Sequence, residues 1–271
     1  MPLVSVIMPA FNAERFIGES IESALAQTLG DIEVLVADDG STDRTQAIVE
    51  EFARRDSRVR LLRAERNSGP AAARNRAIVA ACGRYISFLD SDDRWLPRKL
   101  ERQILAMRSN RWAFSFTGYE IIGADGAVRG LIGAPELVTY RQLLTNNVIG
   151  CLTAIYDSTV VGKIYAPTVG RSDLGLWLRL LRKVGEAQGI DEILAQYRIH
   201  SLSLSRCMHH VARQNWQLYR GEGFGVLMSL WYLGGYAVTG TLKTYFPTMA
   251  RRVGWIAKPR LSSLTSGPQF E

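Results

Sequence analysis

Short apolar runs alternate with amphipathic segments in the first part of the chain. Four of the runs have the length and apolar content of buried strands, and they lie at 4–8, 33–37, 59–62 and 85–89. The segments between them carry apolar residues at helical spacing and predict helices at 15–27, around 48–52 and at 71–81. Pro9 is expected to end the first strand, Ser41 or Thr42 to cap the second helix, and Gly83 to end the third.

Strands separated by helices of this length form βαβ units, so the pattern predicts an α/β protein with a mostly parallel central sheet flanked by helices. Ligands of such sheets bind beyond the carboxyl ends of the strands. Polar segments follow three of the predicted strands, and they lie at 9–12, 38–41 and 90–93. We therefore expect these segments at one rim. The Gly-x-Gly-x-x-Gly pattern does not follow the first strand, which disfavours a dinucleotide cofactor.

The alternation changes after about residue 110. Strands are predicted at 112–122, 152–156 and 194–199, a hairpin turn at 123–126, and helices around 140–144 and at 174–183. No Gly/Ser-rich linker separates the two parts, so the second part is expected to pack on the same sheet as a subdomain. The predicted organisation is a half at 1–110, a half at 111–205 and a helical tail at 206–271.

Composition and charge narrow the class of protein. With 47% hydrophobic residues, 271 residues can bury a substantial core. Cys82, Cys151 and Cys207 are odd in number and far apart, which argues against a disulfide framework or a zinc site. No basic segment precedes the short apolar N-terminal run, so no signal peptide is expected, and the expected location is the cytoplasm. The net charge of +7 suits nucleotides or an anionic membrane surface. Because Lys and Arg are scattered rather than gathered in a stripe, no nucleic-acid partner is expected.

The tail has a pattern of its own. Residues 224–242 contain no charged side chain, but Gly, Ser and Thr dilute their apolar character below that of a typical spanning helix. Basic residues follow this segment: Lys243, Arg251, Arg252, Lys258 and Arg260. The pattern favours an interfacial helix or helical hairpin on an anionic leaflet, on the inner face of the cell membrane. Ordinary packing on the domain and a true span are the alternatives.

Carboxylates at strand ends are the candidate chemistry. Asp90 and Asp92 follow an apolar strand two residues apart, and paired carboxylates bind Mg²⁺ or Mn²⁺ together with substrate phosphates. Asp39 can accept a base N–H or a ribose hydroxyl, but it can also cap the next helix. Asp173 precedes an amphipathic helix, where it is either an N-cap or a general base. His200 follows a strand, and a single histidine there is usually structural.

In order and approximate spacing, the chain resembles the family 2 glycosyltransferases of the GT-A fold over about its first 205 residues. The matching segments are 4–12, 36–43, 67–75, 88–97, Asp173 with 176–178, and 197–200. Each motif alone is weak evidence for the family, whereas the whole set in this order is specific to it. The resemblance implies a GT-A fold. It also implies inverting transfer of a sugar from a nucleotide-diphosphate donor to a saccharide hydroxyl, and UDP is the commonest nucleotide of such donors.

The resemblance also implies a role for each matched residue on the donor side. Phe11 would stack on the nucleotide base, flanked by Pro9. Asp39 would hydrogen-bond the base, and Asp38 would help to shape that pocket. Arg74 would lie near the nucleotide or its phosphates.

The other implied roles concern the metal and the reaction. Asp90 would touch the ribose or the donor sugar, and Asp92 would bind the Mn²⁺ or Mg²⁺ that bridges the diphosphate. His200 would approach the diphosphate or the metal. Asp173 would be the catalytic base. Relatives often have Glu-Asp here, and Ser172 stands in place of the Glu, so the role of that Glu, such as orienting the acceptor, is not carried over to this chain.

The basic, aromatic tail predicts where the acceptor is. A lipid-linked saccharide used in cell-surface polysaccharide synthesis would suit a cytoplasmic enzyme that lies peripherally on the membrane. Two alternatives remain open: a nucleotide-sugar-binding protein without activity, and another Asp-x-Asp enzyme such as a nucleotidyltransferase or a phosphatase with an aspartate nucleophile.

Overall fold

The computed structural model describes residues 1–200 and 208–245. The strands are β1 (Val4–Ala10), β2 (Ile32–Asp38), β3 (Val59–Arg63), β4 (Tyr85–Phe88), β5 (Arg94–Trp95), β6 (Phe114–Gly123), β7 (Val128–Ile132), β8 (Leu137–Thr139), β9 (Ile155–Asp157) and β10 (Glu186–Ile199). The helices are α1 (Ile17–Leu25), α2 (Thr45–Arg55), α3 (Pro70–Ala80), α4 (Lys99–Asn110), α5 (Tyr140–Thr145), α6 (Ser158–Val161), α7 (Ser172–Val184), α8 (Met208–Gly221) and α9 (Val226–Tyr245), with a 3₁₀ turn, η1, at Cys151–Thr153.

The first half of the chain forms the parallel part of one sheet, in the order β3-β2-β1-β4. Both faces of β1, β2 and β4 are covered, and the side chains divide between two cores by strict alternation. Ile7 of β1 belongs to one core, whereas Val6 and Met8 belong to the other. Burial on both faces explains why these strands are continuous apolar runs in the sequence.

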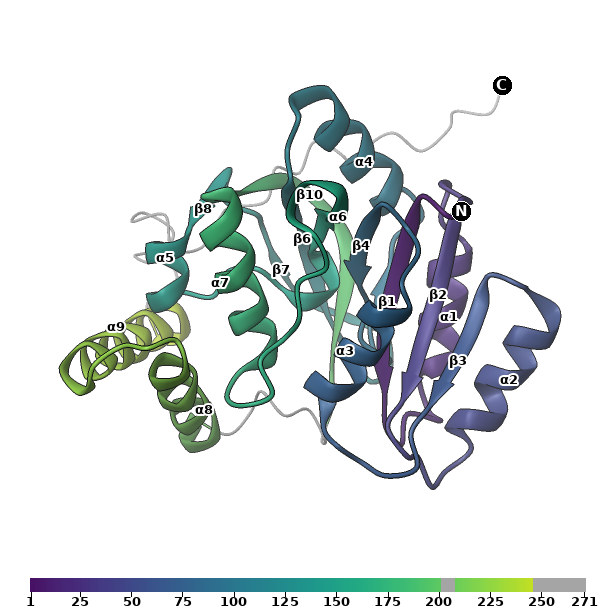
Figure 1. Ribbon diagram of the computed structural model, residues 1–271, viewed down its shortest axis with the longest axis horizontal. Coiled ribbons are helices and arrows are strands. Elements are labelled where there is room, and N and C mark those ends of the chain that lie inside the picture. The colour runs from purple at the N-terminus through teal and green to yellow at the C-terminus, as the bar shows by residue number, and fades with distance from the viewer. Residues whose placement is uncertain (201–207, 246–271) are drawn as a thin grey trace.

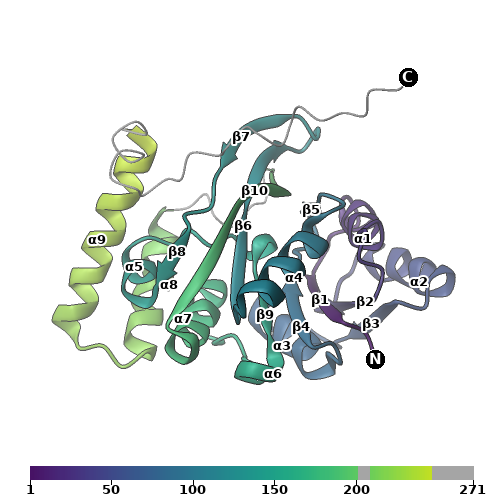
Figure 2. The same ribbon diagram turned by 90° about the horizontal axis from the view of Figure 1, so that it is seen from above.

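Helices form a layer on each side of the sheet (Figures 1 and 2). On one side, α3 and α7 pack over Phe88 and Phe114, and Trp177 of α7 meets the ring of Phe88 edge-on at 5.2 Å. On the other side lie α1 and α4, which bury Ile21 and Ile104. This arrangement confirms the predicted α/β architecture.

The second half extends the same sheet. Strand β9 pairs antiparallel with both β4 and β6, and β10 runs parallel to β6. Strands β5, β7 and β8 add antiparallel pairs at the edges. The parallel character is therefore concentrated in the first half, while the second half is mixed. The predicted hairpin at 123–126 joins β6 to β7.

Three predicted element ends are wrong. β1 continues through Pro9 to Ala10. α2 begins at Thr45, so neither Ser41 nor Thr42 caps it. α3 ends at Ala80, and Gly83 instead lies against β1, where a Cβ atom would stand 2.6 Å from the amide nitrogen of Ser5. The helix α4 was not predicted, because the apolar residues on its inner face are few.

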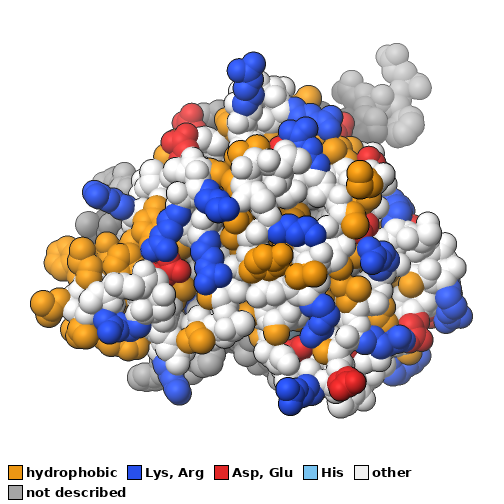
Figure 3. All heavy atoms as spheres, viewed as in Figure 1, with side chains coloured by type: hydrophobic (Ala, Val, Ile, Leu, Met, Phe, Trp, Pro, Cys, Tyr) orange, Lys and Arg blue, Asp and Glu red, His pale blue; other side chains and the backbone are white. Residues whose placement is uncertain are grey.

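The tail packs on the domain through one face. Leu218 and Tyr219 are buried, and the Tyr219 hydroxyl donates to the carbonyl of Leu144 at 2.6 Å. The opposite face of α9 is exposed, with Leu227 at 85% and Trp231 at 74% (Figure 3, where hydrophobic side chains gather over α9). Among the helices of residues 1–200 and 208–245, none is both long enough and apolar enough to cross a bilayer. The basic residues after this segment have side chains outside the described part of the chain: Lys243, Arg251, Arg252, Lys258 and Arg260.

Candidate active site

The predicted polar segments lie at one edge of the sheet. Ala10 at the end of β1 pairs with Asp38 at the end of β2, and β4 runs parallel to β1 on its other side. Because the three strands point the same way, the segments that follow them share one rim. Phe11, Asp39 and Asp90 each lie just beyond a strand end on this rim.

A pair of buried aspartates organises the loop after β2. The Oδ2 atom of Asp38 accepts hydrogen bonds from the amides of Gly40 and Ser41, so Asp38 shapes the loop rather than facing solvent. The Oδ2 atom of Asp39 accepts from the amides of Ser68 and Gly69, at 2.9 and 2.7 Å. Its Oδ1 atom has no hydrogen-bond partner within the described residues, although Arg76 lies 3.5 Å away. Asp39 therefore keeps one acceptor oxygen for a ligand.

Phe11 is presented by a loop that is fixed on both sides. Asn12, whose φ is +47°, donates its amide to Ser41 Oγ and accepts from the Thr42 amide, both at 2.9 Å. This exchange uses the two residues that were expected to cap α2. Phe11 itself is 46% exposed, whereas Pro9 is buried within β1. The aromatic ring is thus available at the rim, and Pro9 lies in the strand behind it.

One arginine joins the Asp90 loop to the start of α7. Arg74 is 4% exposed, and its Nη2 atom donates to Asp90 Oδ1 while Nη1 donates to Ser172 Oγ, both at 3.0 Å. Burial raises the pKa of Asp90, and the charges of Asp92 and Asp173 raise it further. The Arg74 charge lowers it by less, so the pKa of Asp90 is above its ordinary value. Two motifs that are remote in the sequence therefore meet across a single guanidinium.

Cys151 of η1 lies beside this pair, with its Sγ atom 3.6 Å from Arg74 Nη2. Burial and the Asp90 charge raise the pKa of this thiol well above its ordinary value, so it is neutral at physiological pH. The thiol thus adds packing to the site and no charge.

Asp92 and His200 form a second polar pair at the rim. The Nε2 atom of His200 lies 2.8 Å from Asp92 Oδ2, and the His200 ring packs against Phe16 with 5.3 Å between centroids. A carboxylate and an imidazole are suitable donors for Mn²⁺, and Mg²⁺ accepts the carboxylate. Among the described residues, no group of three or more His, Cys, Asp and Glu side chains could hold a cation alone. The residues fit a cation whose remaining ligands are substrate phosphates.

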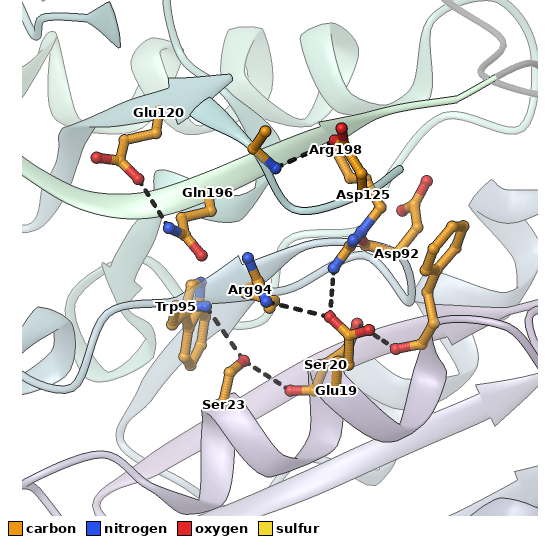
Figure 4. Close-up of polar contacts among 12 residues, drawn as sticks. Glu19, Ser20, Ser23, Asp92, Arg94, Trp95, Glu120, Asp125, Gln196 and Arg198 are labelled. Atoms are coloured by element: carbon orange, nitrogen blue, oxygen red, sulfur yellow. Dashed lines mark hydrogen bonds and ion pairs between the residues drawn. The ribbon is translucent and has the colours of Figure 1, made fainter. Parts of the chain in front are cut away.

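Arg198 supports the Asp92 loop, although it belongs to none of the site residues predicted from the sequence. Its Nε atom donates to the Asp92 carbonyl at 2.8 Å, and its backbone amide donates to Asp93 Oδ1 at 2.9 Å. Its Nη2 atom reaches Glu19 Oε2 at 2.6 Å (Figure 4). Its position two residues before His200 is the one sequence signal that could have identified it.

Asp173 lies in the first turn of α7, where Arg171 occupies the N-cap position, so Asp173 is not the cap. Its Oδ2 atom accepts from Arg171 Nη2 at 3.2 Å and from Asn147 Nδ2 at 3.4 Å. Burial raises the pKa of Asp173, but the Arg171 charge, the Leu174 amide and the Arg74 charge lower it by more, so its pKa is below the ordinary value. The carboxylate is ionised at neutral pH and can accept a proton. Neither Arg171 nor Asn147 carried a signal in the sequence.

Fold and site together define a nucleotide-sugar transferase of the GT-A type: a parallel half-sheet with acidic side chains at its strand ends, and an ionised carboxylate at a helix start joined to them through Arg74. The chain belongs to glycosyl transferase family 2, whose family model matches residues 5–156. The protein is therefore a glycosyltransferase, as its sequence predicted.

Two bacterial relatives match nearly the whole chain. The putative teichuronic acid biosynthesis glycosyltransferase TuaG of Bacillus subtilis is 41% identical over 245 residues, which cover 89% of this chain and 97% of TuaG. The UDP-Glc:alpha-D-GlcNAc-diphosphoundecaprenol beta-1,3-glucosyltransferase WfgD of Escherichia coli is also 41% identical over 245 residues, covering 90% of this chain and 96% of WfgD.

Solved structures share the fold at lower identity. Residues 1–349 of Staphylococcus aureus TarS, in complex with UDP-GlcNAc, align with a TM-score of 0.66 and 22% identity over 97% of this chain and 77% of TarS 1–349. The mannosyltransferase PcManGT of Pyrobaculum calidifontis, in complex with GDP-Man and Mn²⁺, aligns with a TM-score of 0.64 and 17% identity over 93% of this chain and 79% of PcManGT. These likenesses establish the GT-A fold.

Proposed function

We propose that the protein transfers a sugar, with inversion, from a UDP-sugar to a hydroxyl of a lipid-linked saccharide in cell-surface polysaccharide synthesis. The observation that carries the proposal is the guanidinium of Arg74, which bridges the Asp90 loop and the first turn of α7. This bridge brings the proposed donor-binding residues within reach of the proposed base. The UDP-Glc and diphosphoundecaprenol in the name of WfgD and the UDP-GlcNAc complex of TarS support the substrate classes.

The half at 1–110 binds the donor in this proposal. Phe11 stacks on the base from its exposed position, and Pro9 supports it from within β1. The Oδ1 atom of Asp39, which has an ion-pair contact to Arg76 but no hydrogen bond within the described residues, accepts a base N–H, while Asp38 holds the loop in shape. Aromatic stacking together with a matched acceptor favours one base over others.

The Asp90–Asp92 segment receives the sugar and the diphosphate. Asp90, held by Arg74, faces the ribose or the transferred sugar, and Asp92, with His200 beside it, would hold Mn²⁺ or Mg²⁺. When bound, the cation would supply Lewis-acid stabilisation of the charge that grows on the leaving diphosphate. Arg198 keeps Asp92 in place through its carbonyl, so the carboxylate keeps its orientation.

Asp173 acts on the acceptor, which the half at 111–205 binds. As the acceptor oxygen forms its bond to the anomeric carbon, its proton passes to the Asp173 carboxylate. The bond between the anomeric carbon and the diphosphate oxygen breaks with its electron pair going to the diphosphate. Such base catalysis contributes roughly 10²–10⁴-fold. A direct displacement inverts the anomeric configuration and needs no second protein nucleophile.

The tail at 206–271 meets the anionic inner surface of the membrane in this proposal. The exposed face of α9 presents Leu227 and Trp231, and Arg179, Arg182 and Lys183 are exposed on α7. Apolar side chains beside cations suit an interface of lipid chains and anionic headgroups. A lipid-linked acceptor would be found at that interface.

Flotation with phosphatidylglycerol vesicles tests the membrane contact. The double variant L227S/W231S should lose most of its vesicle binding. The matched control V79S/V160S replaces exposed apolar residues on α3 and α6, which are 62% and 64% exposed, and should float like the wild type. Equal flotation of the two double variants would refute the proposed surface.

A panel of nucleotide sugars tests the function itself. The full-length protein, Mn²⁺ or Mg²⁺ and a membrane-lipid extract should release free UDP from one UDP-sugar and convert a lipid acceptor into a larger glycolipid. D173N should lose at least 10²-fold in turnover while still binding UDP. Binding without turnover in the wild type would favour an inactive binding protein, and an aspartyl-phosphate would favour a phosphatase.

A further inference from the structure

The tail helix reaches the proposed catalytic base through a single arginine. The Nη1 atom of Arg171 donates to the hydroxyl of Tyr236 on α9 at 2.5 Å, and the Arg171 guanidinium lies 5.9 Å from the centroid of the Tyr236 ring. The other terminal nitrogen, Nη2, donates to Asp173 Oδ2 at 3.2 Å. One planar group thus joins α9 to the carboxylate.

Arg171 needs such a partner to hold its orientation. An arginine side chain has several rotatable bonds, and two directional contacts on different nitrogens fix the plane of its guanidinium. The side chain is 20% exposed, so water can reach it and could replace the contact to Asp173 if the guanidinium turned. The Tyr236 hydroxyl removes that freedom.

Tyr236 is itself held by contacts on either side of it in α9. Thr239 Oγ1 donates to the Thr145 carbonyl at 2.6 Å. A Cβ atom at Gly235 would stand 2.9 Å from Thr145 Cγ2, so the helix backbone approaches α5 closely at this point. The position of the Tyr236 hydroxyl is therefore set by the packing of α9 on the domain.

We propose that Tyr236 is a positioning residue for the catalytic base: it holds Arg171 so that the guanidinium faces the Asp173 carboxylate. The inference rests on the proposed function, because it takes Asp173 as the base. It makes the tail helix a part of the catalytic apparatus. The same helix carries the exposed apolar face, so a single element would link the membrane surface to the reaction.

The charges around Asp173 come from several elements. Arg171 lies at the start of its own helix, Arg74 reaches it from α3, and Asp90 acts on it from the loop after β4. The Cys151 thiol of η1 and the Asn147 amide also face it. Of the two cations, only Arg171 depends on Tyr236. Loosening Arg171 therefore weakens the attraction that keeps Asp173 ionised and leaves the others in place.

The test is Y236F in the full-length enzyme, which removes one hydroxyl and keeps the ring. We expect kcat to fall on the order of tenfold or more, because a misplaced base loses its alignment with the acceptor. The KM for the UDP-sugar should stay within about twofold, since the donor site is not touched. The acid limb of the kcat–pH profile should move to higher pH by roughly half a unit or more, because Asp173 protonates more readily.

The matched control is Y232F, the same substitution four residues earlier on α9, where the ring packs against Tyr219 and Phe224 at 5.8 and 5.1 Å. It should leave kcat and the pH profile as in the wild type. R171M should be at least as impaired as Y236F, and Y236F/R171M should be no worse than R171M alone, because the two residues act through one contact.

The outcomes separate this inference from the proposed function. If D173N is inactive but Y236F keeps the wild-type kcat and pH profile, Tyr236 does not position the base and the inference is wrong. Additive losses in Y236F/R171M would also overturn it. If D173N retains full turnover, the base assignment itself fails, and with it the proposed function.

Discussion

Replacing Lys99 by methionine should stabilise the protein at neutral pH. Lys99 of α4 is fully buried, and its Nζ atom donates to Ser87 Oγ at 3.1 Å and to Gln103 Oε1 at 2.8 Å. It also lies 4.1 Å from the centroid of the Trp95 ring. These partners are neutral, and burial lowers the pKa of Lys99 well below 10.5. Methionine has a similar length and shape and carries no charge.

The size of the effect follows from two opposing contributions. Lys99 can always lose its proton, so its burial at pH 7 cannot cost more than the free energy of deprotonation, about 5 kcal/mol for a pKa near 10.5. The variant leaves Gln103 Oε1 without its donor, which costs about 1–3 kcal/mol. Ser87 Oγ still donates to the Ala154 carbonyl. The net gain is therefore at most about 2–4 kcal/mol, and each kcal/mol raises the Tm by roughly 2–4 °C for a domain of this size.

The sign of the pH dependence follows from linkage. Because the pKa of Lys99 is lower in the folded state, the unfolded chain binds more protons between the folded pKa and about 10.4. The free energy of unfolding of the wild type therefore rises with pH across that window. The advantage of K99M should therefore be greatest near neutral pH and should shrink toward pH 10.

Differential scanning fluorimetry at pH 7 and pH 9.5 measures both effects. K163M is the control, because Lys163 is exposed, and a surface change of this kind should alter stability by less than about 0.5 kcal/mol. A lower Tm for K99M at pH 7, or an advantage that does not change with pH, would show that the contacts of the ammonium outweigh its burial.

The alternating apolar runs were sufficient to predict the first half of the fold. Strands β1 and β2 are buried on both faces, so their apolar character is continuous and their positions can be read from the sequence, although both strands extend beyond the predicted ends. The helix starts were harder. Ser41 and Thr42 have the right chemistry for a cap, but Asn12 from the neighbouring loop binds both. Side chains that could cap the neighbouring helix instead form hydrogen bonds to a residue that is distant in the sequence.

The candidate site was predicted as a set of side chains, and the structure adds the contacts that hold them. Strand-end carboxylates such as Asp90 were recognisable because a parallel sheet collects strand ends at one edge. The pairings that hold them were not recognisable, even where a partner such as Arg74 had been predicted as a site residue. Arg74 bonds Ser172 across 98 positions of the chain, and Arg171 bonds Tyr236 across 65. Arginine and tyrosine are common surface residues, so nothing local in the sequence marks such pairs.

Three further predictions concern the donor base, the metal and the sheet. F11A should weaken UDP binding by about 1–3 kcal/mol, the value of one aromatic stack, with kcat at saturating donor little changed; calorimetry with UDP that gives the wild-type Kd would refute the stacking role. H200A should raise the Mn²⁺ concentration for half-maximal turnover by roughly 10–100-fold, and chelator should abolish wild-type activity until Mn²⁺ is restored; turnover that survives chelation would exclude a metal role. G83A should destabilise the protein by about 1–3 kcal/mol, because the new methyl group would stand 2.6 Å from the Ser5 amide nitrogen and β1 cannot move without disturbing its neighbours on both sides. G30A is the comparison for that substitution, since a Cβ atom there meets nothing within 4 Å. Similar urea midpoints for G83A and G30A would mean that the sheet yields at Gly83 and that the close approach to β1 carries no energetic consequence.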